Sequence, residues 1–158
     1  MMMLREPILA VHIASGSAGL ILGPLAMRAP KRRGRHTRIG ETYHWVMLTV
    51  CVSAVGLSAL AWSRIWWLTP IAVFSYANAF VGYLAAKHRR AGWLRPHIGG
   101  MGGSYIALVT ALLVVNFGGR PLILWFIPTL VGTPIIALAT ARASVRPRLG
   151  RSSVARSS

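Results

Sequence analysis

Five histidines are the side chains of this sequence best suited to ligate a metal or to transfer a proton: His12, His36, His44, His88 and His97. Paired neutral imidazoles are the usual ligands of a low-spin haem built into a helix bundle. His44 and His97 each follow a basic segment closely, which predicts a similar depth on one side of the bundle. The sequence therefore predicts one metal centre ligated by His44 and His97, with haem as the cofactor.

Glycines accompany two of these histidines at helical spacing. Gly16, Gly19 and Gly23 follow His12 at steps of four, three and four residues, so all four lie within about 60° on one helix face. Such a face suits a flat cofactor or a closely packed helix, and simple helix packing explains the glycines equally well. Gly100 belongs to a second cluster, directly after His97, that could widen a cofactor site. The predicted cofactor contacts are His44, His97, His12, Gly16 and Gly100.

Glu41 precedes His44 by three residues and can reach it on one helical face. A carboxylate there could orient a ligating imidazole, relay a proton, or serve as a counter-charge for neighbouring arginines. The chain has no HExxH, CxxC or GxSxG motif, no phosphate-binding loop ending in Lys-Ser, and no Asp. Enzymatic activity is left open, because only a redox cofactor would supply the chemistry.

Composition indicates the solvent in which these groups are placed. Of 158 residues, 54% are hydrophobic and 13% charged, whereas a soluble domain has roughly a quarter of its residues charged. Several apolar stretches reach the roughly 20 residues that a helix needs to cross a bilayer. We expect an all-α, polytopic transmembrane bundle of five helices, over residues 7–27, 38–62, 65–86, 94–117 and 121–141.

The basic residues alternate between the two ends of these spans. Counted along the chain, the segments outside the apolar cores hold one, six, one, four, one and five Lys or Arg. The positive-inside rule then places the N-terminus outside and the C-terminus in the cytoplasm, in a bacterial cytoplasmic (inner) membrane. The net charge of +16 is explained by this topology and by attraction to anionic lipids, so no nucleic acid partner is expected.

Residues 142–158 are rich in Arg and Ser and lack apolar periodicity. The sequence predicts two parts, a transmembrane domain over residues 1–141 and a disordered basic cytoplasmic tail over residues 142–158. A homo-oligomer or a membrane complex is a further expected association.

Three sequence blocks resemble a known family. They are VHIASGSAGLILGPLAM with His12, RHTRIGETYHW with His36, Gly40 and Tyr43, and LRPHIGGMGGSYIAL with His97. Together they resemble the predicted membrane protein family called domain of unknown function 2306 (DUF2306), over residues 8–112. Thr37 and Glu41 stand where that family has basic residues. The resemblance implies a polytopic membrane fold and draws attention to the three histidines, but it implies no reaction.

The functional hypothesis is a small membrane protein that binds b-type haem through intramembrane histidines, in electron transfer or a redox-accessory role. Two alternatives from other classes are a cofactor-free structural or assembly subunit of a membrane complex, and a small transporter.

Overall fold

The structure is a computed structural model that describes residues 2–30, 34–117 and 122–154, with side chains described as far as residue 143. Its helices are α1 (Met2–Arg28), α2 (Arg35–Leu60), α3 (Trp62–Ile65), α4 (Leu68–His88), α5 (Leu94–Asn116) and α6 (Ile123–Val154). The described residues contain no strand.

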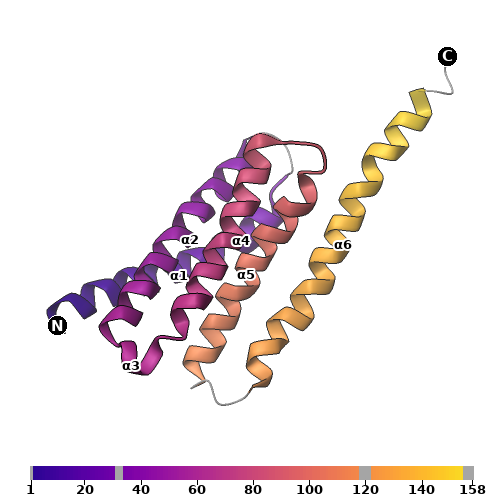
Figure 1. The fold of residues 1–158 in the computed structure, drawn as a ribbon. Helices are drawn as coiled ribbons and strands as arrows, with labels where there is room; N and C mark the ends of the chain where they lie inside the picture. Colours follow the sequence, from indigo (N-terminus) through magenta and orange to yellow (C-terminus); the bar gives the residue numbers. More distant parts are fainter. Residues whose placement is uncertain (1, 31–33, 118–121, 155–158) are drawn as a thin grey trace.

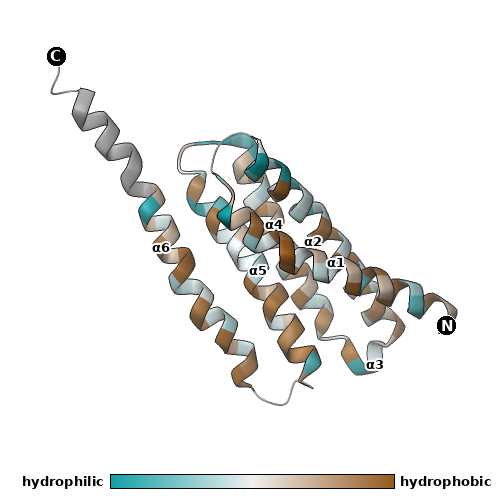
Figure 2. Cartoon of the chain, turned by 180° about the vertical axis from the view of Figure 1, so that it is seen from behind, coloured by the Kyte–Doolittle hydropathy of each residue, from teal (hydrophilic) through white to brown (hydrophobic). Residues whose placement is uncertain are grey.

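Five of these helices are long and apolar enough to cross a membrane, namely α1, α2, α4, α5 and the part of α6 that ends at Ala143. This confirms the predicted all-α fold with five spans and indicates a multi-pass membrane protein. The side chains that point outward are largely apolar; Phe74 and Leu130, for example, are 67% and 69% exposed. Figure 2 shows the apolar residues along the middle of the helices and hydrophilic residues toward their ends, as a bilayer requires.

The helices form a four-helix bundle with one helix added outside. α1 packs on α2, α2 on α4, and α4 on α5, while α1 also meets α5 and closes the bundle. α6 packs mainly on α5, with Trp125 also against Trp67 just before α4, and lies at the edge of the fold (Figure 1). The core between the four inner helices centres on Tyr43, Met47 and Leu108. The Tyr43 hydroxyl lies 3.1 Å from Ser104 Oγ, so this buried pair ties α2 to α5 by a hydrogen bond within the span.

Two expected boundaries differ from the structure. α2 begins at Arg35, three residues before the predicted start at Arg38, and this places His36 in its first turn. α6 continues helically to Val154, across most of the segment 142–158 for which a disordered tail was expected. That stretch also contains Pro147 and Gly150, the two weakest helix formers, so helix propensity does not explain the helix there. Residues 155–158 lie outside the described residues, and the division into two parts stays a prediction.

Candidate functional site

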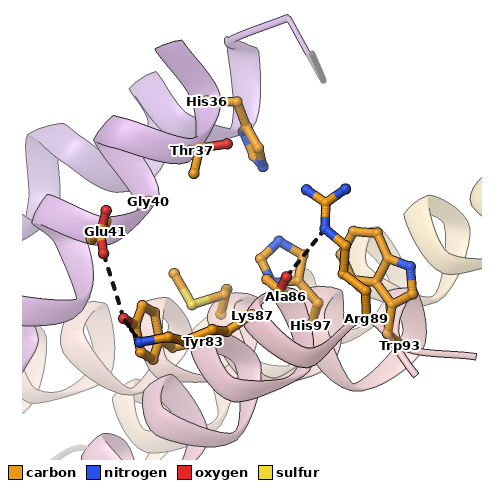
Figure 3. Close-up of a pocket in the computed structure, with 11 residues that line it drawn as sticks. His36, Thr37, Gly40, Glu41, Tyr83, Ala86, Lys87, Arg89, Trp93 and His97 are labelled. Atoms are coloured by element: carbon orange, nitrogen blue, oxygen red, sulfur yellow. Dashed lines mark hydrogen bonds between the residues drawn. The ribbon is translucent and has the colours of Figure 1, made fainter. Parts of the chain in front are cut away.

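His36 and His97 face each other at the end of the bundle that carries most of the basic residues. Their ring centroids are 6.1 Å apart, and the ring planes are nearly perpendicular, at 83°. His36 lies in the first turn of α2 and His97 in the first turn of α5. Figure 3 shows the two side chains entering one gap from opposite sides. The fold therefore brings together two imidazoles that are 61 residues apart in the sequence.

The same backbone interaction holds each of these rings. His36 Nδ1 lies 2.9 Å from the carbonyl oxygen of Ala26, and His97 Nδ1 lies 2.9 Å from that of Gly82. A carbonyl oxygen only accepts hydrogen bonds, so Nδ1 carries the proton in both rings. Each ring would consequently ligate a metal through Nε2, and the carbonyl bond is the interaction by which proteins usually orient a ligating histidine.

A cavity of about 180 Å³ is lined by both rings. Its lining comes from α2, from the C-terminal end of α4, from the loop after α4 and from the start of α5, and consists of His36, Thr37, Gly40, Glu41, Tyr83, Ala86, Lys87, Arg89, Trp93, His97 and Met101. Aromatic, cationic and imidazole groups thus surround a single space at the bundle end.

Glu41 interacts with Tyr83 in this cavity. The Tyr83 hydroxyl donates to Glu41 Oε1 at 3.4 Å, and Lys87 Nζ donates to the same hydroxyl at 3.3 Å. Within the described part of the chain, the single ion pair joins Arg5 and Glu6, so Glu41 is not seen as a counter-charge for an arginine. Its carboxylate instead fixes the position of Tyr83 at the cavity wall.

His44 does not line this cavity, and its pairing with His97 stays a prediction. Its ring stacks on Tyr83, with centroids 4.1 Å apart and planes inclined by 7°, and the Tyr76 and Phe80 ring centroids lie 5.7 and 6.3 Å away. The residue is 3% exposed, and Nδ1 is buried without a hydrogen-bond partner. His44 is therefore part of a buried aromatic cluster between α2 and α4.

The buried nitrogen of His44 leads to a prediction about stability. His44→Phe should raise the free energy of unfolding by about 1 to 3 kcal/mol, because phenylalanine keeps the stack and removes an unsatisfied polar atom. Unfolding in detergent, followed by circular dichroism, would measure the change. His12→Phe is the matched control and should lower stability by about 1 kcal/mol, because it removes a hydrogen-bonded imidazole. A less stable His44→Phe protein would contradict the prediction.

His12 serves to connect α1 with α2. Its Nδ1 lies 3.2 Å from the Val50 carbonyl oxygen and 3.0 Å from Ser53 Oγ. The glycine face beside His12 was predicted to pack closely against a neighbouring helix or a cofactor. Two of its glycines do pack against α5, since a Cβ at Gly19 would meet Leu108 and a Cβ at Gly23 would meet the Tyr105 ring. A Cβ at Gly16 would have open space around it, so this glycine faces neither a helix nor a described group.

Gly100 has a different role from the one expected. A Cβ on Gly100 would lie 2.5 Å from the Asn78 carbonyl oxygen and 2.7 Å from Gly82 N, so the backbones of α4 and α5 touch here. This position therefore brings two helices together and provides no width for a cofactor.

His36 is the site residue that reasoning from spacing missed. The basic run before it favoured a loop, and the predicted start of α2 at Arg38 excluded it from the bundle. The only signal for it was the resemblance of the RHTRIGETYHW block to DUF2306.

The described residues contain no group of three or more His, Cys, Asp or Glu that could hold a metal ion. A structural zinc site needs four such ligands and a catalytic one three.

No protein-family model, curated protein or solved structure matches the chain. The resemblance to DUF2306 accordingly stays a prediction.

Proposed function

We propose that this protein is a membrane-embedded b-type haem protein with an electron-transfer or redox-accessory role, and that His36 and His97 would hold the haem. The observation that carries the proposal is the pair of opposed imidazoles, each held through Nδ1 by a backbone carbonyl. His97 keeps the role that the sequence predicted, and His36 takes the place of His44.

The closeness of the two rings supports the proposal. Their centroids are 6.1 Å apart, and they come from two different helices. His36 and His97 are therefore the two imidazoles that would hold the group.

The side chains around the cavity suit a porphyrin in chemistry, but the cavity is smaller than a porphyrin. Trp93 and Tyr83 offer aromatic walls, and Lys87 and Arg89 stand at the rim. The cavity of about 180 Å³ would hold about six waters, which is less room than a porphyrin needs. The side chains of Met101 and Lys87 are unbranched and flexible, so their rotation is the simplest way to enlarge it.

A bound haem would supply one-electron transfer. The protein's own residues would then ligate, orient and shield it: the Ala26 and Gly82 carbonyls fix the two imidazoles, and the aromatic stack of His44 on Tyr83 excludes water from one wall. The assembly-subunit and transporter alternatives lack a comparable arrangement of side chains in their favour.

The visible spectrum of the purified protein tests the proposal. Protein produced with a haem precursor, or mixed with haem in detergent, should give a Soret band and the sharp reduced bands of a low-spin iron with two histidine ligands. A haem-supplemented protein without a Soret band would overturn the proposal and favour the cofactor-free assembly subunit.

We also propose the orientation and the membrane. The basic segments at one end support a cytoplasmic His36–His97 site and C-terminus, and an external N-terminus, in a bacterial cytoplasmic membrane with anionic lipids. A reporter enzyme fused to the C-terminus should be active only in the cytoplasm. An active periplasmic reporter at that position would reverse the orientation.

A further inference from the structure

We infer that Arg89 and Trp93 bind the phosphate group of an anionic phospholipid at the rim of this cavity. The inference goes beyond the proposed function and needs no haem, because it concerns the short loop that joins α4 to α5. That loop covers residues 89–93, between the span that ends at His88 and the span that begins at Leu94. In a bilayer it lies at the depth of the lipid headgroups.

Arg89 has an uncommon backbone conformation. It ends α4 with φ 46° and ψ 38°, in the left-handed region, and it is the only non-glycine residue with positive φ among the described residues. Glycine, or less often asparagine, is usual at such a helix end, because a Cβ there is strained. Residues held in sparsely populated conformations cluster at functional sites. The strain therefore indicates that the arginine side chain has a function at this position.

The side chain of Arg89 is held in place at the rim. Its guanidinium carbon lies 5.2 Å from the ring centroid of Trp93, and Nε donates to the Ala86 carbonyl oxygen at 3.3 Å. Trp93 lies in turn beside His97, with ring centroids 5.7 Å apart. Figure 3 shows the terminal nitrogens of Arg89 on the same side as the His36 ring. An arginine positioned in advance loses less entropy on binding, and its terminal nitrogens form the fork that matches a phosphate.

Arg89 also has no acidic side chain of this protein to neutralise it. The chain has two acidic residues, Glu6 and Glu41. Glu6 belongs to the single ion pair found in the part of the chain that the structure describes, with Arg5 as its partner. Glu41 lines the cavity, where it accepts a hydrogen bond from the Tyr83 hydroxyl. The exposed guanidinium at the rim is therefore ready to bind an anion from outside the chain.

The membrane itself is the nearest source of that anion. Phospholipid phosphates lie at the depth of this loop, where tryptophan is common because its ring suits the boundary between headgroups and acyl chains. Basic residues next to a transmembrane helix attract anionic lipids in particular. The cavity of about 180 Å³ has room for about six waters, which is more than one phosphate group occupies. Size, depth and charge thus agree on the headgroup of an anionic phospholipid.

The experiment measures lipid binding to the full chain in detergent by native mass spectrometry. The probes are dioleoylphosphatidylglycerol, which is anionic, and dioleoylphosphatidylcholine, which has no net charge. Arg89→Gln should weaken phosphatidylglycerol binding about 10-fold and leave phosphatidylcholine binding within about 2-fold. The matched control is Arg90→Gln, which removes the same charge from an exposed neighbour that does not line the cavity. That control should lose no more than about 3-fold.

A second variant separates binding from folding. Arg89→Gly should weaken phosphatidylglycerol binding as much as Arg89→Gln, and it should raise the melting temperature, because glycine adopts a φ of 46° without strain. Circular dichroism in detergent measures the melting. A lower melting temperature would mean that the arginine is kept for the fold, and this would overturn the inference.

The remaining outcomes concern the ligand. An equal loss of phosphatidylglycerol binding in Arg89→Gln and Arg90→Gln would show attraction by net charge alone, which would overturn a site at Arg89. Inorganic phosphate in excess should leave phosphatidylglycerol bound, since it lacks the acyl chains that hold a lipid in the bilayer. Displacement by inorganic phosphate would reassign the site to the free anion and overturn the lipid. No haem is added in these measurements, so the inference and the proposed function can fail independently.

Discussion

Replacing either His36 or His97 with alanine is expected to abolish the low-spin haem spectrum. In the proposed function each imidazole would hold the haem, and Nδ1 of each is already committed to a backbone carbonyl. Losing a group that merely orients a metal ligand typically costs 10- to 100-fold in affinity, so losing the ligand itself should cost more than about 100-fold. Spectra of haem-loaded variants, at equal protein concentration, give the measurement.

Two other histidines provide matched controls. His88→Ala removes an exposed imidazole at the same end of the bundle, and His44→Phe removes a buried one beside the cavity. Both variants should keep the low-spin spectrum. If His44→Phe lost it while His36→Ala kept it, the original pairing of His44 with His97 would be right, and the site described above would be wrong.

The spans of this fold could be predicted from sequence because the bilayer leaves few options. A run of about 20 apolar residues must form a helix, since lipid offers its backbone no hydrogen-bond partner. Helix ends were harder to place. The start of α2 depends on Gly34 to Arg38, a basic stretch without the apolar pattern that marks a span, so His36 was assigned to a loop.

Which histidines lie next to each other could not be predicted from their spacing within a single helix. The sequence predicts a similar depth in the membrane for His44 and His97. The direction of the His44 side chain, however, depends on how α2 is rotated about its own axis relative to α4. In the structure that rotation turns His44 toward Tyr76, Phe80 and Tyr83. No single helix carries this information, because contacts between helices 30 or more residues apart determine it.

The glycines after His97 connect the packing of the bundle with the site. Gly82 touches Gly100 across the α4–α5 contact, and its carbonyl oxygen also binds His97 Nδ1 at 2.9 Å. The close approach of the two helices therefore places the acceptor for His97. Small residues are the usual means by which membrane helices approach so closely.

Gly100→Ala should consequently destabilise the bundle and weaken haem binding together. The new Cβ would lie 2.5 Å from the Asn78 carbonyl oxygen and 2.9 Å from Gly82 Cα, which are backbone atoms that cannot rotate away. Forcing the helices apart should cost about 3 kcal/mol of unfolding free energy, the upper end for an overpacked core. Gly99→Ala is the matched control on the preceding residue, where a Cβ would meet no atom within 4 Å. The stability of the Gly99→Ala protein should stay the same or rise slightly.

Denaturant unfolding in detergent and haem titration of both variants measure the two effects. Equal stability of the two variants would show that α4 and α5 do not touch at Gly82 and Gly100, and would remove the support that this contact gives to His97.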